Sequence, residues 1–461
     1  MPPHIILTVD LGFGDAGKGS IVDYLTRTHS AHTVVRYNGG AQAGHRVVAP
    51  DGRAHVFAQF GAGTLAGAAT FLSRHMLLEP LAMLEEERHL TRLGLPDALA
   101  NVTLDQQALL ITPFARALNR LRELARGTQR HGSCGIGIGE TVDLALHYPD
   151  HAPRAGDLRH PAILSRKLTF LRERAYERLA ALRPTLPASP DAAAELDLLH
   201  DPDLIPWLLD AYDGFARRVN LVGPEYVCQL LQRDGTIIFE GAQGVLLDEW
   251  RGFHPHTTWS TTTLAYADQL LAEAGFTGQT QRIGITRAYA TRHGAGPLVS
   301  EEPALTAAMP DPANHDHPWQ SNFRVGWLDL VQLRYARAVV GPLDHLAVTC
   351  LDRLAALPEL RICTRYSFSD AAAGTSGLGG NFRGGLGPPR TPLLQLPIVH
   401  PPDLNHQAQL TATLMHCTAH TEPLHDAQHL LARLSQTLDL PVTITSWGPS
   451  ATDKREIEAR M

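Results

Sequence analysis

The stretch GFGDAGKGS, residues 12–20, combines a glycine-rich loop with a lysine and an acid. Its backbone N–H groups can turn toward a phosphate because four positions are glycine, namely Gly12, Gly14, Gly17 and Gly19. Lys18 can neutralise a bound phosphate, but Gly19 stands where the usual loop G-x-x-x-x-G-K-[ST] has a hydroxyl group. A carboxylate beside phosphates, here Asp15, is costly unless it binds Mg²⁺ or takes a proton. The loop therefore predicts phosphoryl transfer in which the protein also deprotonates the acceptor.

Three further glycine-rich segments could bring backbone close to a ligand. In YNGGAQAGHRV, residues 37–47, His45 follows the glycines and can donate to a phosphate oxygen as charge builds there. A surface histidine is the alternative interpretation, because the chain contains 24 histidines. In IIFEGAQGVLLDEW, residues 237–250, Gln243 lies between glycines just past a predicted buried strand, where parallel sheets present ligand contacts. The segment GSCGIGIGETVD, residues 132–143, is either a ligand-binding loop or a generic flexible turn.

The composition excludes several classes of protein. With 461 residues, of which 44% are hydrophobic, the chain has ample material for a buried core. Its formal net charge of -7, with 40 basic residues spread along the chain, predicts no nucleic-acid partner. No apolar run approaches the ~18 residues of a membrane span, and the N-terminus lacks the features of a signal peptide. Five cysteines without paired or metal-type spacing indicate reduced thiols, so we expect a cytoplasmic protein.

These residues need strands and helices to position them. The apolar run at 5–11, the glycine loop and the amphipathic stretch after it follow the order strand, loop, helix, which favours a phosphate loop over an ordinary glycine turn with a surface lysine. Further strands are predicted at 32–38, 236–241, 282–290, 343–350 and 440–448, and helices at 114–127 and 163–183. Strands that alternate with helices predict an α/β fold with a mostly parallel sheet. The stretch 184–206 is expected to be a surface connection, and the glycine-rich stretch 370–392 a mobile loop.

An ordered series of motifs resembles the adenylosuccinate synthetase family over nearly the whole chain. The family's G-D-E-G-K-G-K loop followed by I-V-D corresponds to GDAGKGSIVD, its G-G-x-x-A-G-H to GGAQAGH, and its F-E-G-A-Q-G-x-L-L-D to FEGAQGVLLD. Its A-Y-x-T-R-x-G-x-G-P, G-W-[FL]-D and S-x-G-P motifs are matched by AYATRHGAGP, GWLD and SWGP. The resemblance implies one large P-loop-like α/β domain over 1–461, with a central mostly parallel sheet, a helical insertion at about 95–235, small β subregions and the glycine-rich loop at 370–392.

The resemblance also implies a chemistry and a set of roles. In the family, O6 of inosine monophosphate (IMP) is phosphorylated by GTP and the phosphate is then displaced by the amine of L-aspartate. Asp15 would be the base on purine N1 and, with the backbone oxygen of Gly44, a ligand of Mg²⁺. His45 would stabilise the transferring phosphoryl group and Gln243 would hold the O6 edge. GTP would contact Gly14, Gly17, Lys18, Gly19, Ser20, Asp352, Ser446 and Gly448, with Lys18 also part of the catalytic set. A homodimer is expected from the resemblance as well.

Other positions depart from the family's pattern. The arginine-rich aspartate loop T-T-G-R-x-R-R, which precedes G-W in the family, has become PWQSNFRV at 318–325, and only Arg324 remains in register. A dicarboxylate needs about two fixed cations or bidentate forks to bind well, so the amine donor is left open. Cys350 replaces a lysine that packs on guanine, which leaves ATP as an alternative to GTP. The residues implied for the purine nucleotide and the amino acid are Gln42 (an asparagine in the family), Cys134 (a threonine in the family), Thr258 and Arg324.

Three functions are compatible with this pattern. The first is an adenylosuccinate synthetase of divergent sequence. The second is a paralogue that runs the same phosphorylate-then-displace chemistry on another purine-like acceptor or with another amine. The third is a non-catalytic nucleotide-binding regulator. Retention of Asp15, Lys18, His45 and Gln243 argues against the third, because a protein that only binds nucleotide needs neither a base nor a transition-state donor.

Overall fold

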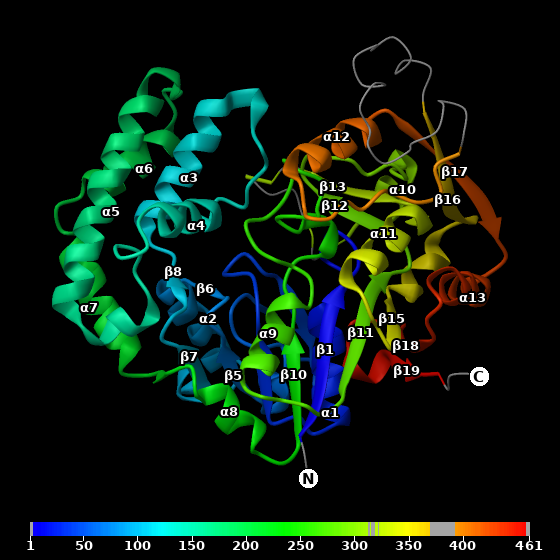
Figure 1. Cartoon of the computed structure of the whole chain (residues 1–461), viewed down its shortest axis with the longest axis horizontal. Coiled ribbons are helices and arrows are strands. Elements are labelled where there is room, and N and C mark those ends of the chain that lie inside the picture. Colours follow the sequence, from blue (N-terminus) through cyan, green and yellow to red (C-terminus); the bar gives the residue numbers. More distant parts are fainter. Residues whose placement is uncertain (1–2, 312–313, 315–318, 321, 369–391, 458–461) are drawn as a thin grey trace.

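A central sheet of ten strands organises the chain (Figure 1). The computed structural model describes residues 3–311, 314, 319–320, 322–368 and 392–457. Neighbouring strands of the sheet are parallel except for the last pair, β18 and β19. The strand order is β19 (Lys454–Glu456), β18 (Val442–Ser446), β15 (His345–Thr349), β11 (Thr280–Arg287), β1 (His4–Asp10), β10 (Thr236–Glu240), β2 (Thr33–Arg36), β5 (Ala69–Leu72), β7 (Val102–Asp105) and β9 (Asn220–Val222). All six predicted strands are present, with ends shifted by a few residues.

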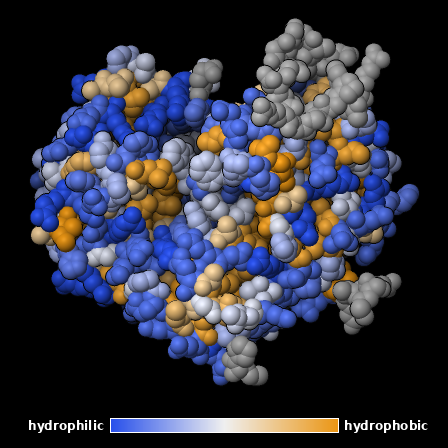
Figure 2. Space-filling model, viewed as in Figure 1, coloured by the Kyte–Doolittle hydropathy of each residue, from blue (hydrophilic) through white to orange (hydrophobic). Residues whose placement is uncertain are grey.

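The sheet is covered on both faces, which explains its continuous apolar strands. Successive side chains of a strand point to opposite faces. In β1, Ile6 packs in one hydrophobic cluster, while Ile5 and Leu7 pack in the other. On the outer surface, hydrophilic and hydrophobic residues are interspersed over the face shown in Figure 2. The residues that specify the fold therefore lie inside, in two layers separated by the sheet.

A helical lobe lies beside the sheet (Figure 1) and contains α3 (Pro113–Arg126), α4 (Ile138–His147), α5 (Pro161–Leu182), α6 (Pro190–His200) and α7 (Leu204–Ala216). The range 95–235, expected to be a helical insertion, holds this lobe and α8 (Tyr226–Leu231), but also β7 and β9, which extend the central sheet. The surface connection expected at 184–206 is wrong, because α6 and the start of α7 lie there. Ser189 caps α6 by accepting from the Ala192 N–H, and Pro190 occupies the first turn, where proline is tolerated.

The remaining elements complete the two layers and several small sheets. The other longer helices are α1 (Lys18–Thr28), α2 (Pro80–Arg92), α9 (Ala265–Glu273), α11 (Leu330–Val340), α12 (Leu404–Leu414) and α13 (Ala427–Leu438), and α10 (Pro303–Ala308) is short. The small sheets pair β3 (His45–Val48) with β4 (Ala54–Phe57), β6 (Leu77–Leu78) with β8 (Leu109–Leu110), β12 (Ala290–His293) with β13 (Phe323–Gly326), and β14 (Leu328–Asp329) with β16 (Leu360–Phe368) and β17 (Cys417–Leu424). All five cysteines are free. Among the described residues, no helix combines the length and apolar character needed to cross a membrane. The predicted loop at 370–392 lies outside the described residues except for Pro392.

The carboxyl ends of the parallel strands meet at one edge of the sheet. From β1 the chain continues through α1 to β2, which lies on the β10 side of β1. β11 lies on the opposite side of β1, so the direction of the strand order reverses next to β1. Ligands of open α/β sheets bind at such a reversal, outside the carboxyl ends of the strands. The loops after β1, β2 and β10 are the three glycine-rich segments around residues 12, 40 and 243, so the fold brings these motifs to one place.

Candidate active site

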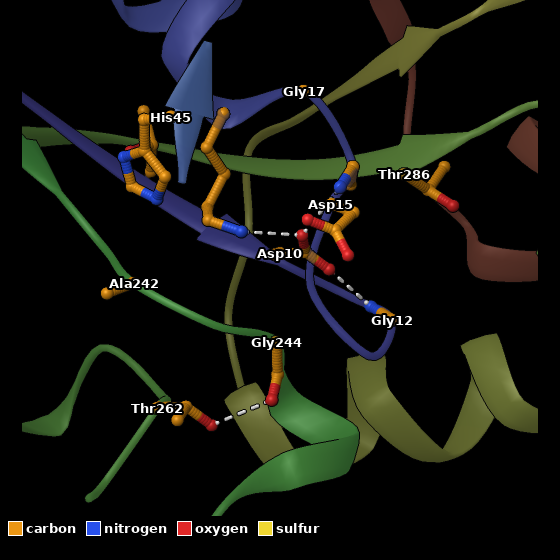
Figure 3. A network of polar contacts seen from close by, with 12 residues as sticks. Asp10, Gly12, Asp15, Gly17, His45, Ala242, Gly244, Thr262 and Thr286 are labelled. Atoms are coloured by element: carbon orange, nitrogen blue, oxygen red, sulfur yellow. Dashed lines mark hydrogen bonds and ion pairs between the residues drawn. The ribbon is translucent and has the colours of Figure 1, made fainter. Parts of the chain in front are cut away.

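Asp10, the last residue of β1, holds the glycine loop in place (Figure 3). Its Oδ1 accepts a hydrogen bond from the Gly12 N–H at 2.8 Å, and its Oδ2 accepts from the Ala16 N–H at 3.0 Å. Oδ2 also accepts from Lys18 Nζ at 2.7 Å, and both charged side chains are buried. Lys18 is therefore fixed at the start of α1 by an acid that the motif analysis did not single out. An ammonium group has three donors, and the bond to Asp10 uses one of them.

Asp15 lies at the turn of the same loop. It and its glycine neighbours Gly14 and Gly17 have positive φ angles of 56°, 94° and 82°. The Asp15 side chain is 29% exposed, and its Oδ2 lies 3.5 Å from Nε2 of His293 on β12. Its backbone oxygen accepts a hydrogen bond from Arg287 Nε at 2.5 Å. The backbone of Asp15 is thus anchored while its carboxylate stays within reach of a ligand.

His45, the first residue of β3, pairs with Glu240, the last residue of β10. Both side chains are buried, and His45 Nδ1 lies 2.5 Å from Glu240 Oε1. Burial lowers the pKa of His45 to about 4, although the charge of Glu240 opposes this shift. Burial alone would raise the pKa of Glu240, but the charge of Arg36 and the hydrogen bonds from His45 and the Ala62 N–H outweigh it and lower that pKa. Glu240 is therefore a carboxylate that accepts the Nδ1–H of a neutral imidazole, which leaves Nε2 as an acceptor. To donate from Nε2 to a phosphate, the ring must take up a second proton when the anion binds.

The close contact between α1 and β3 explains the missing hydroxyl residue of the loop. A Cβ atom at Gly19 would lie 2.8 Å from the carbonyl carbon of His45, so a serine or threonine does not fit there. The next residue, Ser20, donates its hydroxyl to the Gly17 carbonyl at 3.1 Å. Gly44, expected to offer its backbone oxygen to a metal ion, is exposed beside His45. The departure from the usual phosphate loop is thus a packing requirement.

Gln243 lies where the loops after β1, β2 and β10 touch. It has a positive φ of 57°, and its Oε1 is buried with no hydrogen-bond partner among the described residues. A Cβ at Gly39 would lie 3.0 Å from that oxygen. A Cβ at Gly244 would lie 2.2 Å from the Gly12 carbonyl oxygen and 2.3 Å from the Gly14 nitrogen. The backbones are in direct contact, so the three predicted motifs form one cluster.

A second cluster surrounds the start of α4. Both amide atoms of the Gln42 side chain are buried and lack hydrogen-bond partners in the part of the chain that the structure describes. A Cβ at Gly40 would lie 2.9 Å from Gln42 Oε1 and 2.8 Å from Cδ1 of Ile138, the first residue of α4. Cys134 borders the same small apolar cluster, and burial raises the pKa of its thiol. The free N–H groups at a helix start and an unpartnered amide suit an anion or a polar ligand edge.

Thr258 approaches this second cluster from the other side. Its N–H donates to the Leu247 carbonyl at 2.8 Å, which ties its segment to the loop after β10. Its neighbour Trp259 lies against the first turn of α4, where a Cβ at Gly139 would be 3.4 Å from the indole ring. The structure therefore brings the segments of Gln42, Cys134 and Thr258 together, as the sequence indicated.

A third group of predicted residues lies at the ends of the adjacent strands β15 and β18. Asp352 is exposed in the short 3-10 helix Leu351–Ala356 after β15, and Ser446 ends β18 and donates its hydroxyl to the Gly448 carbonyl at 3.0 Å. Lys454, on β19, donates to the Gly448 carbonyl at 2.9 Å. Burial lowers the pKa of Lys454 to about 8, although nearby acids including Asp453 and Asp352 oppose the shift. Lys454 is a buried cation of this region that sequence reasoning missed.

Arg324 is less available to a ligand than predicted. It lies on β13, and its Nε and Nη2 donate to the Gly294 carbonyl at 3.1 and 2.7 Å. Nη2 also donates to the Gly296 carbonyl at 2.8 Å, and Nη1 forms an ion pair with Glu301 at 2.6 Å. All three nitrogens of the guanidinium group are engaged within the protein. A carboxylate ligand could bind Arg324 only by displacing Glu301 or these carbonyls.

Trp319, in the stretch that differs from the family's arginine-rich loop, contacts the helical lobe instead. Its ring lies 5.5 Å from the guanidinium of Arg120 and 5.9 Å from that of Arg130. A Cβ at Gly135 would lie 2.8 Å from the indole. This part of the divergent loop therefore packs against the loop that precedes α4, close to Cys134.

Comparisons with known proteins show the family to which the chain belongs. A family model described as adenylosuccinate synthetase matches residues 7–454. The chain belongs to the adenylosuccinate synthetase family. Curated adenylosuccinate synthetases include that of Clostridium beijerinckii, 33% identical over 370 residues (78% of this chain and 80% of that one). That of Chlorobium limicola is 31% identical over 467 residues (97% of this chain and 96% of that one). The α/β fold, the family and an NTP-dependent C–N ligase of purine biosynthesis are thereby confirmed.

Two solved structures share the family's fold with this chain. Fully ligated adenylosuccinate synthetase from Plasmodium falciparum superposes with a TM-score of 0.74 at 17% identity, covering 99% of this chain and 100% of that one. Cyanophage S-2L succinoaminodeoxyadenylate synthetase, PurZ, superposes with a TM-score of 0.51 at 15% identity, covering 99% and 96%. That structure contains dGMP and, as an energy donor, dATP. At these identities the likeness concerns the fold alone.

Sequence reasoning missed the partners that hold the predicted family residues. Asp10 and Glu240 lie within or next to a quoted motif and Lys454 follows SWGP, and each is buried against a named site residue or its loop. A signal was present for Glu240, which precedes the glycines of FEGAQG at the end of an apolar strand. A charged residue in that position is costly unless it has a partner, so it points to a buried pair.

Proposed function

We propose that this family member uses GTP to phosphorylate O6 of IMP, or of a related purine nucleotide, and then replaces the phosphate with the amine of L-aspartate. The observation that carries the proposal is the partly exposed carboxylate of Asp15 in a phosphate-type loop, in one cluster with Gln243 and the His45–Glu240 pair. A loop that only grips phosphates gains nothing from a carboxylate, whereas a reaction that must deprotonate its acceptor requires one.

In the proposed reaction, Asp15 accepts the proton from purine N1, and the electron pair moves to O6. O6 then attacks the γ-phosphorus of GTP, and the bond to the β–γ bridging oxygen breaks to release GDP. The amine attacks C6, loses a proton, and inorganic phosphate leaves with the C6–O6 electron pair. The unpartnered Oε1 of Gln243 marks an amide free to meet the purine edge, and His45 lies on the phosphate side of the cluster, near Lys18. Hydrogen-bond donors that are already positioned at the transferring phosphoryl group usually give the largest stabilisation of the transition state in such reactions.

The oxygen donors proposed for Mg²⁺ fit that ion. Asp15 offers a carboxylate and Gly44 a backbone carbonyl, and both residues are accessible. No group of three metal-binding side chains occurs among the described residues. Mg²⁺ in phosphoryl-transfer sites is typically held by one or two carboxylates together with substrate phosphates, so a single carboxylate is sufficient. When bound, Mg²⁺ would neutralise charge on the triphosphate.

The region at the ends of β15 and β18 would hold the base of the triphosphate. Asp352 is an exposed acceptor there, and the N1–H and 2-amino groups of guanine are adjacent donors that a carboxylate can accept together. At the end of the adjacent strand, Ser446 donates to the Gly448 carbonyl, which also accepts from Lys454. ATP remains the alternative donor, because Cys350 stands where the family has a lysine against guanine.

The second candidate is a paralogue with another acceptor or amine. It is favoured by Arg324, whose nitrogens are bonded to Glu301 and to two backbone carbonyls. An amino acid with a single carboxylate, or an amine without one, places less demand on this site than aspartate does. The neutral thiol of Cys134 likewise departs from the hydroxyl of the family.

A two-stage assay separates the candidates. Purified protein with IMP, GTP, Mg²⁺ and L-aspartate is expected to form adenylosuccinate, seen as a rise in ultraviolet absorbance, with one phosphate released per product. A flat trace with measurable GTP binding rejects the IMP–aspartate reaction. Purine nucleoside monophosphates are then screened against amino acids by phosphate release. The absence of amine-dependent phosphate release for every pair contradicts both candidates.

Replacing Glu240 with glutamine is expected to lower kcat about tenfold or more, with the KM for GTP nearly unchanged. The amide oxygen can still accept from His45 Nδ1, but it removes the negative charge that stabilises a protonated imidazole. Steady-state kinetics measure the effect, and a melting curve shows whether the variant is folded. Glu273→Gln, at a half-exposed carboxylate that pairs with Arg74 outside the loop cluster, is the matched control. A Glu240→Gln enzyme with the kcat of the unmodified protein would exclude this role for Glu240.

A further inference from the structure

Asp15 belongs to a closed circuit of polar contacts that none of the roles above uses. Its backbone oxygen accepts from Arg287 Nε at 2.5 Å, and the two terminal nitrogens of Arg287 donate to Asp311 Oδ2 at 3.2 and 3.1 Å. The same Oδ2 accepts from Asn314 Nδ2 at 3.0 Å. Asn314 Oδ1 lies 3.1 Å from His293 Nε2, and that nitrogen lies 3.5 Å from Asp15 Oδ2. The circuit therefore contacts Asp15 at its backbone and again at its carboxylate.

The circuit fixes which nitrogen of His293 carries a proton. Asn314 must direct its NH₂ group to the Asp311 carboxylate, because a carboxylate only accepts. Its carbonyl oxygen therefore faces His293 Nε2, which must be the donor. The other ring nitrogen, Nδ1, is buried and has no hydrogen-bond partner in the described ranges. The ring also packs against Phe323, with centroids 4.8 Å apart, so its plane is restricted.

We propose that His293 is a positioning residue that holds the carboxylate of Asp15 in the orientation needed for deprotonation, with Asn314 fixing the imidazole. The proposal rests on the function proposed above, in which Asp15 is the base. The Nε2–H of His293 is shared between Asn314 Oδ1 and Asp15 Oδ2. Contacts of this kind are often long before substrate binds and shorten afterwards. Oδ1 of the same carboxylate is the atom this arrangement presents to the purine.

The place of His293 in the motif series is compatible with this role. His293 occupies one of the three unspecified positions of the motif A-Y-x-T-R-x-G-x-G-P, where the family requires no fixed residue. Asp311 and Asn314 lie just before the divergent stretch at 318–325. The carboxylate of Asp15 is therefore contacted by a side chain at a position that the family motif leaves open. A substitution at Asp311 or Asn314 can therefore change the orientation of the Asp15 carboxylate through Arg287 or His293.

Matched variants of His293 test the proposal. A glutamine can place an amide N–H near the position of Nε2, whereas a leucine cannot donate. His293→Leu is expected to lower kcat about tenfold or more, because a small misplacement of a reacting group has effects of this size. The KM for GTP and the GTP dissociation constant without Mg²⁺ should change less than about threefold. His293→Gln should recover most of kcat, and Asn314→Leu should resemble His293→Leu.

Controls separate this proposal from its premise. His425→Leu and His425→Gln, at an exposed histidine, should leave kcat unchanged, and melting curves show that each variant is folded. If the unmodified protein has no activity with any acceptor and amine, the proposed function fails. If it is active and His293→Leu keeps its kcat, the positioning role is wrong. Equal losses in His293→Leu and His293→Gln, or a loss of GTP affinity matching the loss of kcat, would also overturn it.

Discussion

Replacing Asp15 with asparagine is expected to reduce turnover by about two to four orders of magnitude while GTP binding stays nearly unchanged. Asparagine has the same shape and adopts the left-handed backbone conformation readily, so the φ of 56° at this position is preserved. Its oxygen can still meet His293. The substitution therefore removes the ability to accept a proton and also the charge proposed to bind Mg²⁺, so GTP binding is compared in the absence of Mg²⁺. Steady-state rates measure turnover, and calorimetric titration with GTP measures binding.

The same substitution at Asp97 provides a matched control. Asp97 also has a left-handed backbone, with φ of 55°, and it is exposed far from the loop cluster in sequence. Asp97→Asn should retain full activity. An Asp15→Asn enzyme that keeps more than about a tenth of the rate would remove Asp15 from the role of base. A parallel loss of GTP binding would instead assign Asp15 to the nucleotide site alone.

The second large effect is expected for Lys18→Met, as a loss of stability of about 3–5 kcal/mol. Asp10 and Lys18 form an ion pair at 2.7 Å with side chains 0% and 3% exposed. Removing the lysine leaves a buried carboxylate without its counter-ion, while two loop N–H groups still depend on that carboxylate. The denaturant midpoint should fall, and GTP affinity should fall with it because a phosphate-neutralising cation is lost.

Two comparisons make this expectation specific. Lys167→Met breaks an ion pair of similar length, 2.8 Å, but its side chains are 16% and 14% exposed, so the loss of stability should be smaller. Asp10→Asn combined with Lys18→Met removes the uncompensated charge and should recover part of the stability. If Lys18→Met is as stable as the unmodified protein, the Asp10–Lys18 pair does not hold the loop. Recovery of stability without recovery of GTP binding is the expected pattern for the double variant.

Sequence reasoning located most of the fold because its signals were local. The strand at 5–11 and the helix at 114–127 have apolar residues at periods that need no knowledge of their neighbours. The prediction for 184–206 was wrong because prolines and acids are as typical of turns as they are of the first turn of a helix. In the structure, Ser189 and Pro190 begin a helix. Buried contacts of that helix favour it over a turn, and these contacts cannot be seen in the local sequence. The strands β7 and β9 could not be assigned to the main sheet, because strand order is a property of long-range pairing.

Sequence reasoning proposes site residues where chemistry alone selects a residue type, and it misses residues that only tertiary contact selects. Asp15 and Gln243 stand out because an acid among phosphates and a glutamine between glycines need a reason. His293 has no such local anomaly, and Glu240 shows only that it needs a partner; their roles follow from distances of 3.5 Å to Asp15 and 2.5 Å to His45, both far away in the chain. The ion pair between Arg324 and Glu301 likewise cannot be predicted from a motif, because it depends on which side chains meet in the folded protein.

The absence of space for even a methyl group at Gly244 has a consequence for how new specificities can arise. The turns that carry Asp15 and Gln243 interlock, so neither can be remodelled alone without dislodging the other. Evolution, or a designer building a mutant library, has more freedom in the segments around Cys134 and Trp319. Substitutions that change substrate specificity should therefore accumulate around Cys134 and Trp319, whereas the two interlocked turns should change little.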